Sequence, residues 1–232
     1  MTSLAWAELG VALGVNGIGL LYSMILSTWK IPAALRAGAE RRSKGLWERL
    51  PLIFFNCFWM YGSAILALNF LPQVFSTEWK GWLMWGLQMG FILLVDDTGF
   101  YWLHRFLHEN RLAYARIHKL HHRAYAPLPL DYMYTHPAEV FLGAIAPSLA
   151  LLLLGAWMGQ INGWVVVGYH LFRNSRELLL HSGVRSLMRG VPFLPVEHHE
   201  LHHGKPGLGN YGSTFGFWDN FQKTAAPQNG VR

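Results

Sequence analysis

The sequence contains very little cysteine and few charged residues. Its 232 residues include a single cysteine, Cys57, within an apolar run, so no disulfide framework can form. Only 14% of the residues are charged, against about a quarter in soluble globular proteins. Hydrophobic residues make up 52%, and eleven residues are tryptophan. This composition excludes a secreted, disulfide-stabilised domain and is typical of a chain embedded in lipid.

Signals for bound redox cofactors and for separate domains are also missing. No dinucleotide-binding fold is visible, and the HPAE run at residues 136–139 is not a haem-binding HPGG-type motif. No internal repeat, long linker or low-complexity tract divides the chain. We therefore predict a single domain over residues 1–232.

Several apolar stretches have about the length needed to cross a bilayer. They cover residues 4–29, 51–71, 81–103 and 138–159, and a shorter one covers 161–172. The first is interpreted as a retained span, because it is long and no basic residue precedes its apolar core. Two Gly-x3-Gly pairs, Gly10 with Gly14 and Gly86 with Gly90, fit close helix packing in lipid.

The basic residues are distributed unevenly between these stretches. Six lie between the first and second stretches, five within 104–137 and seven from 173 onward, whereas 72–80 carries only Lys80. The positive-inside rule makes the side with 18 of the 19 basic residues cytoplasmic. We therefore predict an N-terminus on the opposite side, a hairpin over 138–172 and a cytoplasmic C-terminus. This membrane pattern accounts for the net charge of +6, and we predict no nucleic-acid partner.

Most of the twelve histidines gather on the predicted cytoplasmic side. In DDTGFYWLHRFLHEN, residues 96–110, His104 and His108 share a helix face with Asp97. The boxes IHKLHH and HELHH both have the spacing i, i+3, i+4, which favours one helix face for each box. Their histidines are His118, His121 and His122 in the first box, and His199, His202 and His203 in the second. Metal coordination would offset the desolvation that so many imidazoles cost.

Three further side chains are candidates because of their positions. Asp97 lies at membrane depth, where an ionisable group is costly and usually functional. We predict that it accepts a hydrogen bond from a ligating imidazole, with helix capping or packing as the alternative. His136 in THPAEV and His181 in LLLHSG lie where the chain meets the cytoplasmic face. Whether His136, His170, His198 or Glu177 completes the ligand set stays open at this point.

Two alternatives to a larger metal centre compete for these histidines. HELHH also satisfies H-E-x-x-H, the motif of zinc proteases. One catalytic zinc takes only three protein ligands, so a protease would leave the other boxes unexplained. A non-catalytic metal-binding or transport protein would place its ligands along a path within the spans, whereas these gather at one face.

The motifs occur in a recognisable order along residues 97–224. They are D-x3-YW-x-HR-x2-LH at 97–108, the IHKLHH box, HPAE at 136–139, HSG at 181–183, HELHH at 199–203, NYG at 210–212 and DNFQKT at 219–224. In this set the chain resembles the fatty acid hydroxylase / sterol desaturase superfamily of membrane di-iron enzymes. The region between Glu139 and His181 has no match specific enough to indicate a substrate, so a sterol is not implied.

The resemblance implies a fold, a cofactor and a reaction. The fold is all-α, a polytopic membrane helix bundle of about four to five spans including a hairpin, with a cytosolic histidine-rich metal-binding cap. The cofactor is two iron ions, which zinc can replace in overproduced protein. The reaction is O2-dependent hydroxylation or desaturation of a lipid, with electrons from a ferredoxin, rubredoxin or cytochrome b5 type protein. The implied ligands are His104, His108, His118, His121, His122, His136, His181, His199, His202 and His203.

Overall fold

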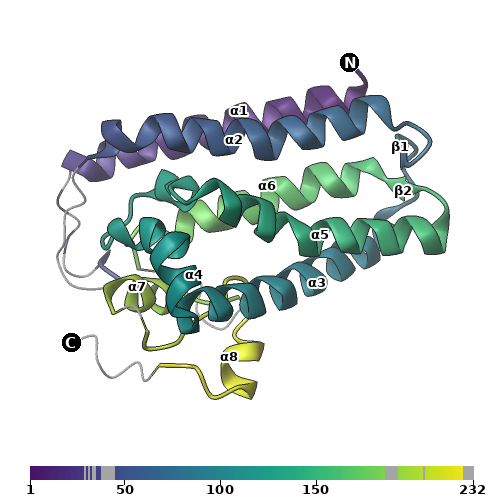
Figure 1. The fold of residues 1–232 in the computed structure, drawn as a ribbon. Helices are drawn as coiled ribbons and strands as arrows, with labels where there is room; N and C mark the ends of the chain where they lie inside the picture. The colour runs from purple at the N-terminus through teal and green to yellow at the C-terminus, as the bar shows by residue number, and fades with distance from the viewer. Residues whose placement is uncertain are drawn as a thin grey trace.

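Five long helices form a bundle in the computed structural model (Figure 1). The residues described are 1–28, 30, 32, 35–37, 45–185, 193–205 and 207–226. The long helices are α1 (Ser3–Thr28), α2 (Leu46–Phe70), α3 (Trp82–Glu109), α5 (Pro137–Met158) and α6 (Gly163–Leu180). Helix α1 packs against α2 and α6, and α3 packs against α5 and α6. Their positions follow the five apolar stretches of the sequence.

Three helices in the described part of the chain are long and apolar enough to cross a membrane: α1, α2 and α5. Helices α3 and α6 are more polar and include Asp96 and Arg173. The 28 residues of α3 span roughly 42 Å, which exceeds the roughly 30 Å of a bilayer core. A membrane around α3 can therefore leave its last turns, with His104 and His108, outside the hydrocarbon. The number of crossings stays a prediction.

The two ends of the bundle differ in structure. At one end, strand β1 (Phe75–Ser76) pairs in parallel with β2 (Ile161–Asn162), which joins the α2–α3 connection to the α5–α6 turn. The N-terminus lies at this end (Figure 1). The α5–α6 hairpin thus turns at the end away from the histidines, as the prediction for 138–172 requires.

Short helices gather at the opposite end. They are α4 (Arg111–Arg116), the 3-10 helices η2 (His118–Arg123) and η3 (Pro129–Met133), α7 (Val196–Gly204) and α8 (Phe217–Phe221). The α1–α2 connection reaches this end too, because Ala37 N donates to Gly183 O at 2.9 Å. Residues 227–232, for which we predict a cytoplasmic position, lie outside the described residues.

Close packing of α3 against α5 depends on one glycine. A Cβ placed on Gly99 would lie 2.3 Å from Ala146 Cβ, so only glycine allows this approach. The two Gly-x3-Gly pairs do not serve this purpose. A Cβ at Gly10, Gly14, Gly86 or Gly90 would meet no atom within 4 Å among the described residues. Within the described part of the chain, these pairs therefore make no close contact with another helix.

Candidate metal centre

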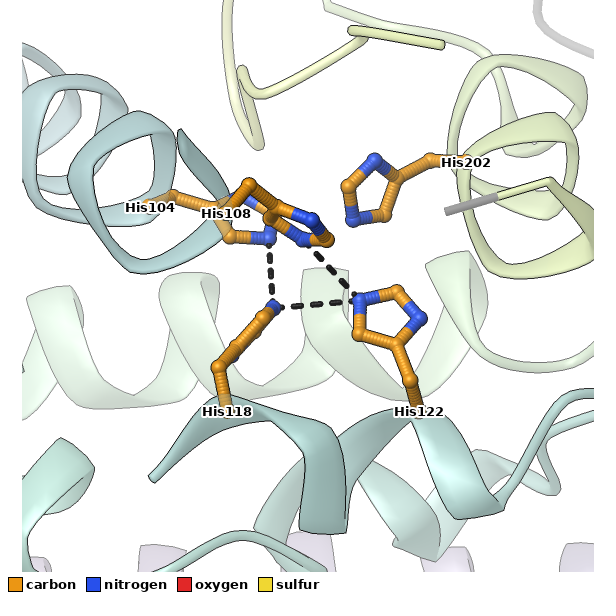
Figure 2. Close-up of side chains that lie close together, drawn as sticks. All are labelled: His104, His108, His118, His122 and His202. Atoms are coloured by element: carbon orange, nitrogen blue, oxygen red, sulfur yellow. Dashed lines mark hydrogen bonds between the residues drawn. The ribbon is translucent and has the colours of Figure 1, made fainter. Parts of the chain in front are cut away.

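Five imidazoles converge at the end of α3 (Figure 2). Helix α3 supplies two of them, η2 two and α7 one: His104, His108, His118, His122 and His202. His118 Nε2 lies 3.1 Å from both His104 Nε2 and His122 Nε2. His122 Nε2 also lies 3.1 Å from His108 Nε2. We call this group the five-histidine cluster.

Four other imidazoles converge beside it, and we call them the four-histidine cluster. They are His121 from η2, His181 at the end of α6, and His199 and His203 from α7. His199 Nε2 lies 3.1 Å from both His181 Nε2 and His203 Nε2. His181 Nε2 lies 3.4 Å from His121 Nε2. All four side chains are buried.

The histidine boxes are divided between the two clusters. The spacing predicted one α-helical face for His118, His121 and His122, but this segment is a 3-10 helix, and His121 joins the other cluster. A 3-10 helix turns every three residues, so the side chains are distributed differently from those of an α-helix. Helices η2 and α7 each serve both clusters, which therefore adjoin. The rings of His122 and His203 lie 4.8 Å apart.

Backbone carbonyls determine which ring nitrogen carries the proton. His104 Nδ1 lies 2.8 Å from Tyr211 O, and His202 Nδ1 lies 2.8 Å from Gly209 O. In the other cluster the acceptors are Glu177 O for His181 Nδ1, at 2.9 Å, and Tyr134 O for His121 Nδ1, at 3.3 Å. A carbonyl oxygen only accepts, so each Nδ1 donates its proton and each Nε2 of a neutral ring keeps a lone pair.

His121 and His181 show most clearly that a cation fits between these rings. Burial, reinforced by His181, lowers the pKa of His121 to about 3. Burial also lowers the pKa of His181, so both rings are neutral at pH 7. Their Nε2 lone pairs then face each other at 3.4 Å and repel unless a cation lies between them. Nitrogens about 2.1 Å from one ion lie roughly 3 Å apart as neighbours, which matches these spacings. Neutral imidazoles suit iron, copper and zinc.

Nine of the ten predicted ligands thus lie in the two clusters, and His136 does not. His136 precedes α5 as its N-cap, and its Nδ1 accepts from Ala138 N at 3.1 Å. The other candidates for completing the ligand set also lie outside the two clusters. His170 Nδ1 lies 2.7 Å from Glu8 Oε1, and His198 Nε2 lies 3.1 Å from Asp219 Oδ2. Glu177 lies beside His181 but belongs to neither cluster.

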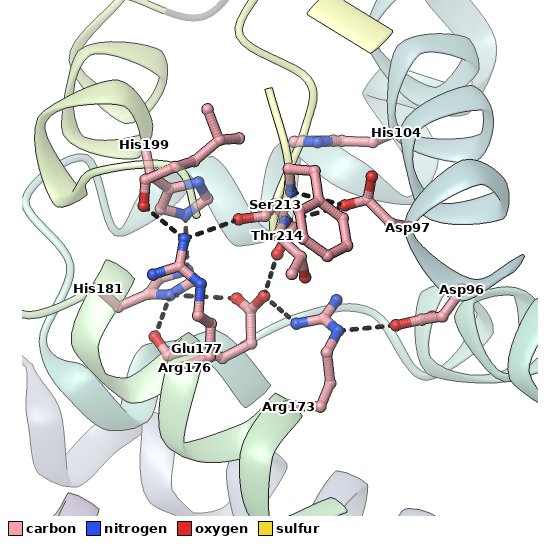
Figure 3. Close-up of polar contacts among 12 residues, drawn as sticks. Asp96, Asp97, His104, Arg173, Arg176, Glu177, His181, His199, Ser213 and Thr214 are labelled. Atoms are coloured by element: carbon pink, nitrogen blue, oxygen red, sulfur yellow. Dashed lines mark hydrogen bonds and ion pairs between the residues drawn. The ribbon is translucent and has the colours of Figure 1, made fainter. Parts of the chain in front are cut away.

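Asp97 differs from its predicted role. Its Oδ1 accepts from Thr214 N and Phe215 N, both at 3.0 Å, rather than from an imidazole (Figure 3). Asp97 lies two turns before His104, so its carboxylate meets the 213–215 segment instead of the ligand rings. The alternative of a packing role describes it better. The segment that it holds continues from Tyr211, whose carbonyl accepts from His104.

Two acidic residues around the clusters were not singled out from the sequence. Glu139 Oε1 lies 2.9 Å from His118 Nδ1. Asp219 accepts from Tyr211 N at 2.9 Å and Gly212 N at 2.7 Å, and so holds the loop that faces His104 and His202. Glu139 lies within the HPAE motif and Asp219 within the DNFQKT motif. Membership in these motifs is the sequence signal that could have identified the two residues.

The loop held by Asp219 also contains a decoy motif. The sequence predicts no dinucleotide-binding fold, yet residues 207–212, GLGNYG, have the G-x-G-x-x-G spacing of dinucleotide-binding loops. They follow helix α7 and have no regular secondary structure, whereas a dinucleotide fold needs a strand before the motif and a helix after it. Gly209 has φ +97°, and a Cβ there would lie 2.0 Å from Thr224 O. The glycine therefore serves the close approach that places its carbonyl against His202.

A cavity of about 180 Å³ adjoins both clusters and extends between α3, α5 and α6. An ion-pair network lies along it (Figure 3). Arg173 Nε lies 3.0 Å from Asp96 Oδ2, and the same guanidinium contacts Glu177. Glu177 also accepts from Ser213 Oγ and lies 3.6 Å from His181 Nδ1. The network thus connects α3 and α6 with one face of the four-histidine cluster.

Comparisons with known proteins identify the relatives of this chain. The methylsterol monooxygenase 1 proteins of Rattus norvegicus and Danio rerio are 29% and 28% identical over 76% and 79% of this chain. The very-long-chain aldehyde decarbonylase GL1-11 of Oryza sativa subsp. indica is 31% identical over 66% of it. The chain spans 61%, 64% and 58% of these relatives. No solved structure matches it. The fatty acid hydroxylase family matches residues 89–224, more than half of the chain. The chain therefore belongs to the fatty acid hydroxylase family, within the superfamily that its motifs resemble.

Proposed function

We propose that this membrane protein is a di-iron oxygenase that hydroxylates or desaturates a C–H bond of a lipid, using O2 and electrons from a separate donor. The observation that carries the proposal is the pair of adjoining clusters whose imidazoles converge through their Nε2 atoms. Two oxidisable metals side by side are what this geometry can hold. The relatives named for methylsterol oxidation and aldehyde decarbonylation support a lipid substrate.

The residues of the chain hold the two ions and shape their surroundings. When bound, the iron pair supplies O2 activation and hydrogen abstraction, chemistry that belongs to the metal. The Nδ1 partners of five ligands orient their rings: Glu139 for His118, and backbone carbonyls for His104, His121, His181 and His202. Burial of the clusters excludes bulk water, and the adjoining cavity admits the reacting part of the lipid.

The zinc protease alternative finds no support in this arrangement. The two histidines of H-E-x-x-H, His199 and His203, lie with His121 and His181 in one cluster. Four imidazoles fill the tetrahedral shell of zinc, whereas a catalytic zinc keeps one position open. The five-histidine cluster would also have no role in a protease. Zinc can still replace iron in overproduced protein, since it competes well for imidazoles.

We further propose that residues 1–232 form one unit with the histidine end in the cytoplasm. The basic connections meet at that end, as the positive-inside rule requires. Arg111, Arg116, Lys119 and Arg123 are exposed there, around the five-histidine cluster. An acidic ferredoxin, rubredoxin or cytochrome b5 type donor fits this surface. Arg116→Glu with Lys119→Glu should raise the KM for the donor and weaken its salt dependence, while metal content stays unchanged.

The test of the proposal is metal analysis with Mössbauer spectroscopy on protein from iron-57-fed cells. We expect about two coupled irons per chain, one for each cluster. His121→Ala should remove iron, whereas His136→Ala, outside both clusters, should not. One zinc and no iron, unchanged after reconstitution with ferrous iron, would refute the di-iron assignment.

A further inference from the structure

One side chain from outside the matched family region reaches the backbone beside the metal centre. Asn56 lies on α2, before the part of the chain that the family matches. Its side chain is buried, and its Nδ2 donates to Met133 O and to Thr135 O, both at 2.9 Å. These carbonyls belong to the residues immediately before and after Tyr134. Asn56 therefore holds the backbone on both sides of the residue whose carbonyl accepts from His121.

The chemistry of the contact fixes the orientation of the Asn56 amide. A carbonyl oxygen only accepts, so the amide must present its nitrogen, whose two N–H groups satisfy one carbonyl each. Asn56 Oδ1 has no hydrogen-bond partner in the described part of the chain. Met133 and Thr135 are buried as well, so bulk water does not replace the amide when it is removed. A substitution without these donors leaves two buried carbonyls unpaired.

The backbone bends at Tyr134, whose carbonyl has a different partner from those of its two neighbours. Tyr134 has φ −81° and ψ 75°, close to an inverse γ-turn with φ about −75° and ψ about +65°. Its carbonyl lies 3.3 Å from His121 Nδ1, the longest of the four carbonyl contacts to ligand rings described above. This distance is near the upper limit of a hydrogen bond, so a small displacement of the bend would release the His121 ring.

Other contacts hold the same segment, but farther from the bend. Ser23 Oγ on α1 accepts from Leu130 N at 2.9 Å. Arg49 on α2 forms an ion pair with Asp131. Attachment of η3 to α1 and α2 therefore does not depend on Asn56 alone. The specific contribution of Asn56 is to the position of the bend and of the carbonyl that it carries.

We propose that Asn56 is a positioning residue for the four-histidine cluster: it holds the bend at Tyr134, and the bend keeps the His121 proton on Nδ1. Without that acceptor the proton can move to Nε2, and the ring can no longer bind a metal through this atom. The inference rests on the proposed function, because it takes the clusters as metal sites. It extends the metal centre to α2, a helix that supplies no ligand.

The experiment follows metal release from each cluster by nitrogen-15 NMR of the histidine rings, assigned with single-histidine variants. The metal is zinc, which binds imidazoles well and is diamagnetic. Under chelator titration, Asn56→Leu should release zinc from the four-histidine cluster at a roughly 10-fold lower chelator concentration than wild type, as for a residue that orients a ligand. The five-histidine cluster should be unchanged. The His121 signal should show the proton on Nδ1 in wild type and lose this preference in Asn56→Leu.

A matched control separates the position of the bend from general loosening of the segment. Ser23→Ala also removes a buried hydrogen bond from this segment, but not one beside Tyr134. It should lower the melting temperature and leave zinc release from both clusters unchanged. Asn56→Asp is a second variant with the same shape, in which a carboxylate faces two carbonyl oxygens. It should change zinc release in the same direction as Asn56→Leu.

The outcomes that would overturn the inference differ from those that test the iron pair. Wild-type zinc release in a folded Asn56 variant, equal loss from both clusters, or the same loss in Ser23→Ala would overturn it. Failure of both Asn56 variants to fold would give Asn56 a general structural role and overturn it as well. A wild-type protein that holds zinc in both clusters but never two coupled irons would refute the di-iron proposal, without changing how the Asn56 variants are judged.

Discussion

Replacing Asp219 with asparagine should release iron from the five-histidine cluster first. Asp219 Oδ1 accepts from Tyr211 N, and Oδ2 accepts from Gly212 N. The Tyr211 carbonyl in turn lies 2.8 Å from His104 Nδ1. Asparagine keeps one acceptor oxygen and replaces the other with an amide that only donates. At least one backbone N–H of this loop then loses its partner, and the carbonyl that orients His104 can shift.

The magnitude follows from the hydrogen bonds that Asp219 accepts. Each carboxylate oxygen accepts a second bond, from Thr224 Oγ1 at 2.7 Å and from His198 Nε2 at 3.1 Å. Burial raises the pKa of Asp219, but these bonds and that from Gly212 N outweigh it and lower the pKa, so the group is ionised at pH 7. Losing two bonds to a charged acceptor costs about 3–6 kcal/mol. Part of this returns through water, and we expect a roughly 10- to 100-fold loss of metal affinity in this cluster.

The assay is chelator titration of iron-57-loaded protein, followed by Mössbauer spectroscopy. The Asp219→Asn protein should pass through a state with one uncoupled iron, because the carbonyls of this loop that accept from ligand rings face His104 and His202, both in the five-histidine cluster. Asn220→Ala, an exposed neighbour on α8, is the control and should behave as wild type. Wild-type affinity in Asp219→Asn, or equal loss from both clusters, would show that the loop does not orient His104.

Three further changes test other parts of the structure. Gly99→Ala should cost about 1–3 kcal/mol through overpacking between α3 and α5, whereas Gly90→Ala, on the same helix but in open space, should not lower the melting temperature. His136→Ala should cost about 1 kcal/mol through the lost N-cap and leave metal content unchanged; a loss of iron would return His136 to the ligand set. For metal-free protein, the pKa values of His121 and His202 are lowered from 6.5 to about 3 when folded. The unfolded state therefore binds more protons below pH 6.5, and the melting temperature should fall as the pH drops from 6.5 toward 3. A melting temperature that does not change over this range would contradict the neutral, buried state of these rings.

The sequence predicts well which histidines form the metal centre. It predicts less well how these histidines are divided between the two clusters. Apolar length located the five long helices, although α3 and α6 continue six and eight residues beyond their apolar stretches, and histidine clustering identified nine side chains that converge. The spacing of His118, His121 and His122 could not show that His121 belongs to a different cluster from the other two. The same short histidine pattern can occur in an α-helix and in a 3-10 helix. It also could not assign Asp219, whose role depends on a loop that returns to α3 from more than a hundred residues away.

The division of the boxes has a consequence for how the two metals are held. Helix α3 serves only the five-histidine cluster, and α6 serves only the four-histidine cluster, while η2 and α7 each bridge both. A movement of α3 relative to α6 would therefore have to be accommodated by two short helices whose side chains would ligate both proposed ions. With both ions bound, that movement is opposed at His121 and His122, neighbours in sequence that belong to different clusters. Two-metal chemistry needs a fixed separation between the ions, and under the di-iron proposal the shared helices η2 and α7 would provide it.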